Sequence, residues 1–410
     1  MATKMNEYEL VDLGRKSWEW AYSRMTIIKH ILEDFGTQLP LEGLKIGFSL
    51  HITKETSVLC LAASMLGAKV GLCAANPLSS QDEIVAFLKS KGIQVFGRRN
   101  ESLSEYEENM LNVLEIKPDV ITDDGANLHV LYHSRSGGCV IGGTEETTSG
   151  VQRLRLMEQD RTLRYPVIAV NNAGTKYLFD NQFGTGQSTI EAIMQITNIL
   201  LAGKKVVVCG YGPVGRGVAT RAKGMGAIVI VTEVNPIRAL EANMDGFEVS
   251  KLNEVLERGD LFITCTGQMD VISRQAIERM NSGAILANAG HFDVEIDSKS
   301  LYSNAEKYYT VRQYMECFEI NHKKLYLLCK GRVVNLVASE GNSPEVMSMS
   351  FANQLLSIIH LSKNYRNLNK TVISVPKEID EFVAYSALSS LGIEIDELSE
   401  AQRKYHSIKK

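Results

Sequence analysis

The stretch from Val206 to Pro236 constrains the fold of this chain more than any other segment. Its apolar start, residues 206–209, is typical of a buried parallel strand and leads into the glycine-spaced turn Gly210-Tyr211-Gly212-Pro213-Val214-Gly215. A helical stretch rich in Ala, Arg and Lys follows, and then a second apolar run at residues 228–231. A strand, a GxGxxG turn, a helix and a strand in this order predict the first unit of a doubly wound α/β domain.

Each glycine of this turn meets a requirement of a bound dinucleotide. Gly210 permits the tight turn, Gly212 lets backbone N–H groups approach a pyrophosphate, and Gly215 lets the helix lie close to the strand. The helix start adds unpaired N–H donors for the phosphates. Glu233 follows the second apolar run, where a carboxylate binds the ribose diol of NAD and repels the extra phosphate of NADP. We therefore expect an NAD site; the alternative is a glycine-rich turn that binds no ligand.

Length and composition limit the class of protein further. A chain of 410 residues is too long for one ordinary core, so we expect at least two domains. A net charge of -4 gives no reason to expect nucleic acid or an anionic membrane as partner. No apolar run is long enough to span a bilayer, and the N-terminus lacks a signal-peptide core. Seven cysteines without a CxxC pair indicate buried thiols in a reducing cytoplasm and no metal site.

Short apolar strands alternate with helices along the chain. Strands are expected at residues 44–50, 69–73, 93–96, 120–122, 139–141, 166–170, 206–209, 228–231, 261–264, 284–287 and 325–328. Helices are expected at 55–66, 81–90 and 343–361, together with a long helix that starts within 183–188, with Ser188 as its cap. The pattern predicts two doubly wound parallel-sheet (Rossmann-like) domains with a central hinge and a short helical C-terminal tail. The expected domains are a substrate-binding domain at 1–183, to which 343–375 returns, an NAD-binding domain at 184–342, and a tail at 376–410.

Polar residues gather at the strand ends, where open α/β sheets place their ligands. They include His51, the pair Asp123 and Asp124, Glu146 and the segment 171–181. Each cluster alone is equally consistent with a solvated loop or a helix cap. Several clusters that face one NAD site favour a functional role.

A series of short motifs carries a more specific signal. In chain order they are SLHITKET, SSQDE, DDGANL, EETTSGV, TKYLFDNQFGTGQS, GYGPVGRG, TEVNP, NAGHFDVEI and GRVVNL. Together they resemble the S-adenosyl-L-homocysteine hydrolase family, from about His51 to Gln354, and most closely its archaeal and thermophilic-bacterial branch. The resemblance implies NAD-dependent, reversible hydrolysis of S-adenosyl-L-homocysteine to adenosine and homocysteine by 3′-oxidation, elimination across C4′ and C5′, water addition and re-reduction. It also implies a cytoplasmic homotetramer with a small-molecule nucleoside substrate.

Carried over position by position, the resemblance implies a role for each matching residue. The catalytic set is His51, Lys176, Asp180, His291 and the position of Asn127, and the substrate-binding set is Thr53, Glu55, Glu146, Asn335 and Asn342. Thr53 and Glu55 would contact the adenine, and His51 would act at C5′. Lys176 would be the base at C3′ or C4′, which requires a depressed pKa that burial provides. The cofactor set is Thr147, Thr148, Asn181, Gly210, Gly212, Val214, Gly215, Glu233 and Asn288.

The chain departs from the family pattern at three places. Asn127 replaces an aspartate thought to assist proton transfer at C5′, and Asn342 replaces a histidine near the ribose and the amino-acid tail. The C-terminus lacks the lysine and tyrosine that many members send to a neighbour's NAD. These changes leave open a paralogue that uses 3′-oxidation on a different 5′-substituted adenosine, as a lyase, dehydratase or hydrolase. A binding protein without catalysis is disfavoured because the proton-transfer residues are retained.

Overall fold

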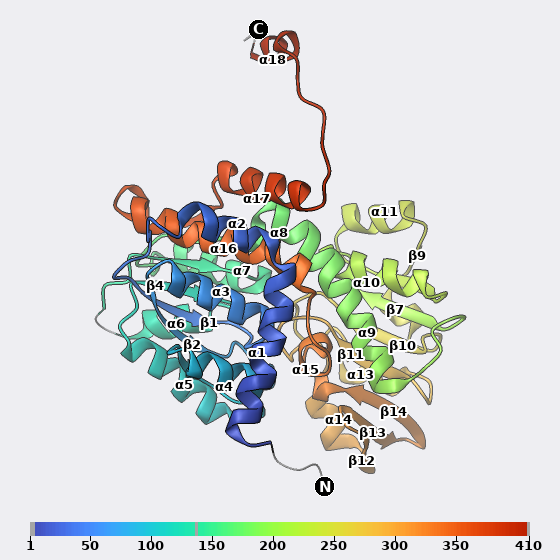
Figure 1. Cartoon of the computed structure of the whole chain (residues 1–410). Helices are drawn as coiled ribbons and strands as arrows, with labels where there is room; N and C mark the ends of the chain where they lie inside the picture. The colour runs from blue at the N-terminus through green and yellow to red at the C-terminus, as the bar shows by residue number, and fades with distance from the viewer. Residues whose placement is uncertain (1–4, 136–137, 408–410) are drawn as a thin grey trace.

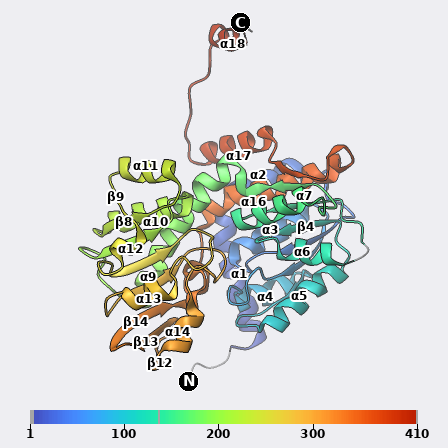
Figure 2. The same ribbon diagram turned by 180° about the vertical axis from the view of Figure 1, so that it is seen from behind.

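Two sheets of short apolar strands organise the chain, and each forms the centre of one lobe (Figures 1 and 2). The computed structural model describes residues 5–135 and 138–407. The first lobe contains the blue and cyan N-terminal part with the orange-red helices of the C-terminal part, and the second lobe contains the green, yellow and orange middle. Within the described residues the two sheets have seven and eight strands. The predicted fold class is confirmed.

The sheet of the first lobe is parallel throughout. Its strands, in order across the sheet, are β15 (Val372–Ser374), β6 (Val167–Ala169), β5 (Gly142–Glu145), β4 (Val120–Asp123), β1 (Lys45–Ser49), β2 (Lys69–Cys73) and β3 (Gln94–Phe96). In β1, Ile46 is paired with Val70 on one side and Val120 on the other. The chain order therefore reverses between β1 and β4.

The sheet of the second lobe repeats this order and adds an antiparallel hairpin at one edge. Its strands are β12 (Lys307–Arg312), β13 (Met315–Ile320), β14 (Lys323–Leu328), β11 (Ile285–Asn288), β10 (Leu261–Thr264), β7 (Lys205–Cys209), β8 (Ile228–Thr232) and β9 (Glu248–Val249). Here the reversal lies between β7 and β10. The strands β12 and β13 were not predicted, because β12 is exposed along its whole length and has no buried apolar run.

Helices cover both faces of the sheets. Those of the first lobe are α1 (Glu7–Arg24), α2 (Thr26–Phe35), α3 (Lys54–Met65), α4 (Asp82–Ser90), α5 (Leu103–Glu115), α6 (Asn127–Ser134), α7 (Thr148–Gln159), α16 (Pro344–Asn364) and α17 (Lys377–Ser390). Those of the second lobe are α10 (Pro213–Gly224), α11 (Pro236–Met244), α12 (Leu252–Val255), α13 (Arg274–Arg279), α14 (Ser298–Asn304) and α15 (Val334–Val337). The short 3₁₀ turns are η1 (Val170–Asn172), η3 (Cys329–Gly331) and η4 (Tyr365–Asn367).

The chain passes between the lobes twice. The first crossing consists of α8 (Gly174–Lys176), the π-helical segment η2 (Tyr177–Gly184) and α9 (Thr185–Thr197). The second crossing runs from α15 to the start of α16. The prediction that Ser188 caps the long helix is wrong, because α9 continues from η2 and begins at Thr185. π-Helical turns are rare and occur mostly at functional sites.

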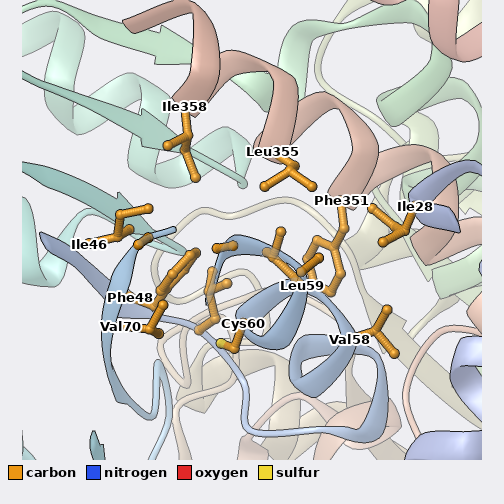
Figure 3. Packing of buried hydrophobic residues seen from close by; sticks show 14 of the residues in the cluster. Ile28, Ile46, Phe48, Val58, Leu59, Cys60, Val70, Phe351, Leu355 and Ile358 are labelled. Atoms are coloured by element: carbon orange, nitrogen blue, oxygen red, sulfur yellow. The ribbon is translucent and has the colours of Figure 1, made fainter. Parts of the chain in front are cut away.

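The returning helix α16 completes the core of the first lobe. Phe351, Leu355 and Ile358 lie above Phe48 of β1 and Leu59 of α3 in a buried apolar cluster (Figure 3). Leu355 and Ile358 are fully buried. Truncating such a side chain to alanine costs about 2–5 kcal/mol, so the C-terminal part of the chain is needed for the stability of the N-terminal part.

Two C-terminal elements also belong to the first lobe. Strand β15 pairs with β6, and α17 packs against α2, α8 and α16. Asp380 of α17 accepts hydrogen bonds from the backbone N–H groups of Gly174 (2.6 Å) and Thr175 (2.9 Å) at the start of α8. The segment predicted as a tail therefore supports the first crossing, whereas α18 (Glu400–Ser407) and the extended stretch that leads to it stand away from the lobes (Figure 1). The predicted domain boundaries stay a prediction.

The strand predicted at 139–141 is wrong, because the structure has β5 at Gly142–Glu145. A β-carbon at Gly142 would lie 2.8 Å from the Leu361 side chain, and one at Gly143 would lie 2.4 Å from the His129 ring. The strand is therefore glycine-rich because helices pack tightly over both its faces. An apolar run could not reveal it.

Candidate active site

A cavity of about 300 Å³ lies between the lobes, at the carboxyl ends of β1, β4, β7 and β10. These are the strands at which the order of each sheet reverses, and open α/β sheets bind their ligands at such reversals. The predicted site residues in its lining are His51, Thr53, Glu55, Glu146, Thr147, Thr148, Lys176, Asp180, Asn181, Gly212, Val214, His291, Asn335 and Asn342. The predicted residues outside the lining are Asn127, Gly210, Gly215, Glu233 and Asn288.

Lys176 ends α8, and its ammonium is buried among oxygen acceptors. The Nζ atom lies 2.6 Å from Asp180 Oδ2, 2.9 Å from Asn181 Oδ1 and 3.4 Å from Asn171 Oδ1. Glu146 Oε1 lies 3.7 Å away. Asp180 and Asn181 reach the ammonium from the π-helical segment, and Asn171, which belongs to the polar segment 171–181, was not predicted as a partner of the lysine.

The expected depressed pKa of Lys176 is wrong. Burial disfavours the ammonium, but the nearby carboxylates of Asp180 and Glu146 outweigh burial, so the pKa of Lys176 lies above its usual value. The resting cavity therefore holds a lysinium ion within a carboxylate cluster. Lys176 can act as a base only after part of the negative charge of Asp180 and Glu146 has been neutralised.

Glu146 follows β5 and is held from the returning helix. Ser350 donates a hydrogen bond to its Oε1 and Gln354 donates one to its Oε2. Burial raises the pKa of Glu146 to about 7, although the Lys176 ammonium opposes this shift. The two donors were not predicted, because they lie inside the helix expected at 343–361 and belong to none of the polar clusters at strand ends.

A second group of titratable residues faces the Lys176 cluster across the cavity. His51 and Asp124 follow β1 and β4, and their Nε2 and Oδ2 atoms are 3.3 Å apart. His291 comes from the second lobe, with its Nδ1 3.6 Å from Asp124 Oδ1. Ser79 Oγ lies 2.6 Å from His51 Nδ1. Burial lowers the pKa of His51 to about 4, although the charge of Asp124 opposes it, so His51 is neutral at pH 7.

Gly125 allows the two lobes to meet at this point. A β-carbon at Gly125 would lie 2.5 Å from His291 Nε2, and the residue has a φ of +110°. A side chain there would push the histidine away from Asp124. The glycine is thus required both by its backbone conformation and by the approach of His291.

The structure does not bring Asn127 into the cavity. Its Oδ1 accepts a hydrogen bond of 2.8 Å from Arg153, and its Nδ2 donates one of 3.0 Å to the hydroxyl of Tyr106. Asp124, three positions earlier in the same loop, is the side chain in the lining. The sequence marks both as polar residues after a strand, but it does not reveal which one points inward.

Thr53 and Glu55 lie at the start of α3, where Thr53 is the N-cap. Glu55 is buried, and burial raises its pKa despite the charge of Lys54. Lys54 Nζ lies 3.3 Å from Glu55 Oε1 and 2.7 Å from Glu340 Oε2. The Lys54 ammonium forms an ion pair with Oε1, and no second donor among the described residues contacts this oxygen. This oxygen is free to accept a hydrogen bond from a ligand.

The GxGxxG turn has the shape that a dinucleotide requires. Gly210 has a φ of +99°, and a β-carbon at Gly215 would lie 1.9 Å from the carbonyl oxygen of Gly210. Glu233 accepts hydrogen bonds from the backbone N–H groups of Tyr211 (2.6 Å), Val234 (2.7 Å) and Asn235 (2.9 Å). A carboxylate has about four acceptor positions, so one remains for a ribose hydroxyl. The residues present fit NAD.

Three other predicted cofactor residues make hydrogen bonds within the protein. Thr148 Oγ1 accepts from Asn171, and the backbone N–H of Thr147 donates to Glu145. Asn288 is fully buried, and its amide bonds to backbone groups of 290, 292 and 331. Asn288 thus fixes the loop that carries His291.

Among residues 5–135 and 138–407, two groups of side chains have the spacing of metal ligands. In the group formed by Asp123, His129 and Glu145, both ring nitrogens and both oxygens of Glu145 already have protein partners. The other group consists of His51, Asp124 and His291. We treat it as an acid–base group, because each histidine lies within ion-pair distance of Asp124, at 3.3 Å and 3.6 Å.

Comparison with known proteins gives matches along nearly the whole chain. Residues 2–138 match the family model described as S-adenosyl-L-homocysteine hydrolase, and residues 181–341 match that of the NAD binding domain of S-adenosyl-L-homocysteine hydrolase. An adenosylhomocysteinase from Sulfolobus acidocaldarius is 51% identical over 99% of this chain and 98% of its own length. One from Aquifex aeolicus is 48% identical over 99% of both chains.

One relative carries a different name. An S-inosyl-L-homocysteine hydrolase from Methanocaldococcus jannaschii is 47% identical over 97% of this chain and 98% of its own length. The nucleoside base therefore differs among proteins of comparable similarity. Among the helices of residues 5–135 and 138–407, none is long and apolar enough to cross a membrane.

Proposed function

Because the chain belongs to the S-adenosyl-L-homocysteine hydrolase family, we propose that it catalyses the NAD-dependent, reversible hydrolysis of S-adenosyl-L-homocysteine to adenosine and homocysteine. The observation that carries the proposal is the pair of proton-transfer groups in one cavity. One is built on Lys176 and Asp180, and the other on His51 and Asp124. A thioether hydrolysis of this kind needs proton transfer at two separate positions of the ribose.

The chemical difficulty is the substrate itself. The thioether on C5′ is a poor leaving group, and the neighbouring C4′ proton is hardly acidic. Bound NAD would supply a reversible hydride acceptor for C3′; while the hydride is held, C3′ would be a ketone and the C4′ proton would be acidified. The protein must then move protons at C3′ or C4′ and, separately, at C5′.

In this proposal Lys176 serves C3′ and C4′. Ribose hydroxyls donate hydrogen bonds to Asp180 and Glu146, and these hydrogen bonds weaken the electrostatic stabilisation of the Lys176 ammonium by the two carboxylates. Burial then favours the neutral amine, which accepts a proton. Thr53 and Glu55 bind the adenine ring of the substrate, and Asn335 lies at the cofactor side of the ribose.

The His51 group serves C5′. The neutral imidazole accepts a proton from the water that adds at C5′, and Asp124 stabilises the imidazolium that forms. In the earlier elimination step the sulfur leaves as a thiolate, and the proton that His51 later takes from the water is the one that balances conversion of this thiolate to the thiol. His291 closes this group from the second lobe. Asp124 replaces Asn127 in the proposed catalytic set because of its place in the lining.

The cofactor is held by the turn and by the facing loops of the first lobe. The proposed contacts are Thr147, Thr148, Asn181, Gly210, Gly212, Val214, Gly215, Glu233 and Asn288. Because Glu233 is acidic, NAD is preferred to NADP. Denaturing the purified protein and identifying the released nucleotide tests this preference, and recovery of NADP would contradict it.

The inosyl substrate is the second candidate, because a relative with 47% identity carries that name. The free Oε1 of Glu55 favours the adenosyl compound, since a carboxylate accepts from the amino group of adenine and repels the oxo group of hypoxanthine. Glu55→Gln keeps the shape of the side chain and replaces one acceptor oxygen with an NH₂ donor. We expect it to shift the ratio of kcat/KM values toward the inosyl compound by about 10-fold or more.

The test of the main proposal uses the purified protein and a panel of substrates. We expect thiol release from S-adenosyl-L-homocysteine and an absorbance of reduced nicotinamide on mixing with adenosine. Release from other 5′-substituted adenosines, but not from S-adenosyl-L-homocysteine, would favour a lyase, dehydratase or hydrolase with another substrate. Binding of NAD and adenosine without either signal would indicate a protein that only binds them.

We further propose a cytoplasmic homotetramer. Helix α11 exposes Ile237, Leu240 and Met244, beside Val234, which is 98% exposed. Such a cluster supports association through the second lobe. All seven cysteines are unpaired, in keeping with a reducing compartment. Light scattering on the eluted protein measures the mass, and a monomer would contradict the proposal.

A further inference from the structure

We propose that Asn342 is a positioning residue whose amide holds the Asp180 carboxylate from the second crossing and thereby fixes the Asp180–Lys176 pair. The proposal rests on the proposed function, in which this pair serves the ribose. It gives Asn342 a role other than the substrate contact expected from the sequence. It also gives a function to a position at which the chain departs from its family.

The side chain of Asn342 forms hydrogen bonds with residues of both crossings. Its Nδ2 donates to Asp180 Oδ1 and, at 3.2 Å, to Thr185 Oγ1. Its Oδ1 accepts from Ser188 Oγ at 2.9 Å and from Asn335 Nδ2 at 3.5 Å. The amide therefore links η2 and α9 of the first crossing to α15 of the second.

The chemistry of the partners determines the orientation of this amide. An ionised carboxylate only accepts hydrogen bonds, so the NH₂ group must face Asp180. The other oxygen of Asp180 lies 2.6 Å from Lys176 Nζ. Asp180 is thus held by one donor from each crossing, and the loss of the amide donor leaves the carboxylate free to rotate about the lysine contact.

Packing keeps the amide in this place. A β-carbon at Gly184 would lie 3.0 Å from Cγ and Nδ2 of Asn342, so the glycine leaves just enough room for the side chain. This contact fixes the position of one crossing relative to the other, because Gly184 ends the π-helical segment and Asn342 precedes α16. The geometry of the catalytic pair is therefore coupled to the relative position of the lobes.

The test compares three variants of Asn342 with a neighbouring control. Asn342→Asp keeps the shape but places a second carboxylate where the donor was, Asn342→Ala removes the amide without adding a charge, and Asn342→His supplies an N–H donor. Ser343→Ala is the matched control, because Ser343 makes no capping hydrogen bond at the start of α16. The measurements are the rate of reduced-nicotinamide formation on mixing with adenosine, the Kd of adenosine, and the amount of bound NAD.

We expect Asn342→Asp and Asn342→Ala to slow reduced-nicotinamide formation by about 10- to 100-fold, the usual effect of losing a hydrogen bond to a charged group. The Kd of adenosine and the NAD content should change by less than about threefold, on the scale of a lost contact outside the ligand. Asn342→His should recover most of the rate, and Ser343→Ala should match the wild type.

Two results would overturn the inference. Asn342→Asp at the wild-type rate would show that only the shape of the side chain matters. Rates that fall only in proportion to adenosine affinity would show a substrate-binding role. If the wild type itself forms no reduced nicotinamide, the proposed function fails separately. In that case a double-mutant cycle of Asn342→Ala with Asp180→Asn in the free energy of unfolding still tests the contact, and additive effects would contradict it.

Discussion

Lys176 and His51 are both nitrogen bases buried in the same cavity, but the protein shifts their pKa values in opposite directions. The pKa of Lys176 is raised above its usual value, whereas that of His51 is lowered to about 4. Burial is the largest cause for both and favours the neutral form of each. The difference comes from the partners.

The partners differ in number and in distance. Lys176 has the Asp180 carboxylate at 2.6 Å and the Glu146 carboxylate at 3.7 Å, whereas His51 has one carboxylate, that of Asp124, at 3.3 Å. His291 also faces His51 and lowers its pKa further. One cavity can thus hold an ammonium and a neutral imidazole at pH 7, the kind of separation that acid and base catalysis requires.

Removal of Lys176 is the most direct way to break this comparison. We expect Lys176→Ala to slow reduced-nicotinamide formation from adenosine by about 10²–10⁴-fold, the usual contribution of a positioned acid–base group. Bound NAD should be retained, because the residue serves the ribose. The control is Lys299→Ala, at an exposed position of α14. A variant that reacts at nearly the wild-type rate would show that Lys176 has been assigned wrongly.

Asp124→Asn removes the carboxylate that lies 3.3 Å from His51. Because the charge of Asp124 raises the pKa of His51, its loss should lower that pKa below about 4 and weaken the base at C5′. We expect thiol release to fall by about 10²-fold, with a much smaller change in reduced-nicotinamide formation from adenosine. Equal losses in both assays would contradict the division of labour between the two groups.

Glu146→Gln sharpens the comparison by removing one carboxylate from Lys176. The charged groups around Lys176 are then Asp180 and the more distant Asp124, so its pKa should fall. Since the neutral amine is the base, the rising limb of the pH profile for adenosine oxidation should move to lower pH. Loss of a ribose contact should also lower the rate several-fold, or about 1 kcal/mol. An unmoved or alkaline-shifted limb would contradict the assignment.

The smallest effect is expected for Asn127→Asp. The side chain lies outside the cavity lining, and a carboxylate there would pair with Arg153. Thiol release should change by less than about twofold, as for substitutions away from a site. A large gain in turnover would instead favour the interpretation that this position shuttles a proton.

The sequence predicted the GxGxxG unit well because its requirements are local. Adjacent residues determine the tight turn, the close approach of the helix and the acidic residue at the strand end. The strand at Gly142–Glu145 could not be predicted in this way, because its glycines are required by the close packing of Leu361 and His129, which come from distant segments.

The candidate site shows the same division. Most of the residues predicted by position-by-position resemblance lie in the lining, but the resemblance chose Asn127 where the structure places Asp124, because the direction of a side chain after a strand depends on packing. It likewise predicted the wrong shift for Lys176. The distance to Asp180 depends on the π-helical turn, which no periodicity revealed.

The placement of β15 and α17 has a consequence for synthesis on the ribosome. The second sheet is continuous in the chain, from 205 to 328, whereas the first sheet gains its last strand only at Val372. Because domains fold as units as they emerge, the lobe that begins first should finish last. The cap that Asp380 provides to α8 emerges later still, so the helix that carries Lys176 acquires its support near the end of translation.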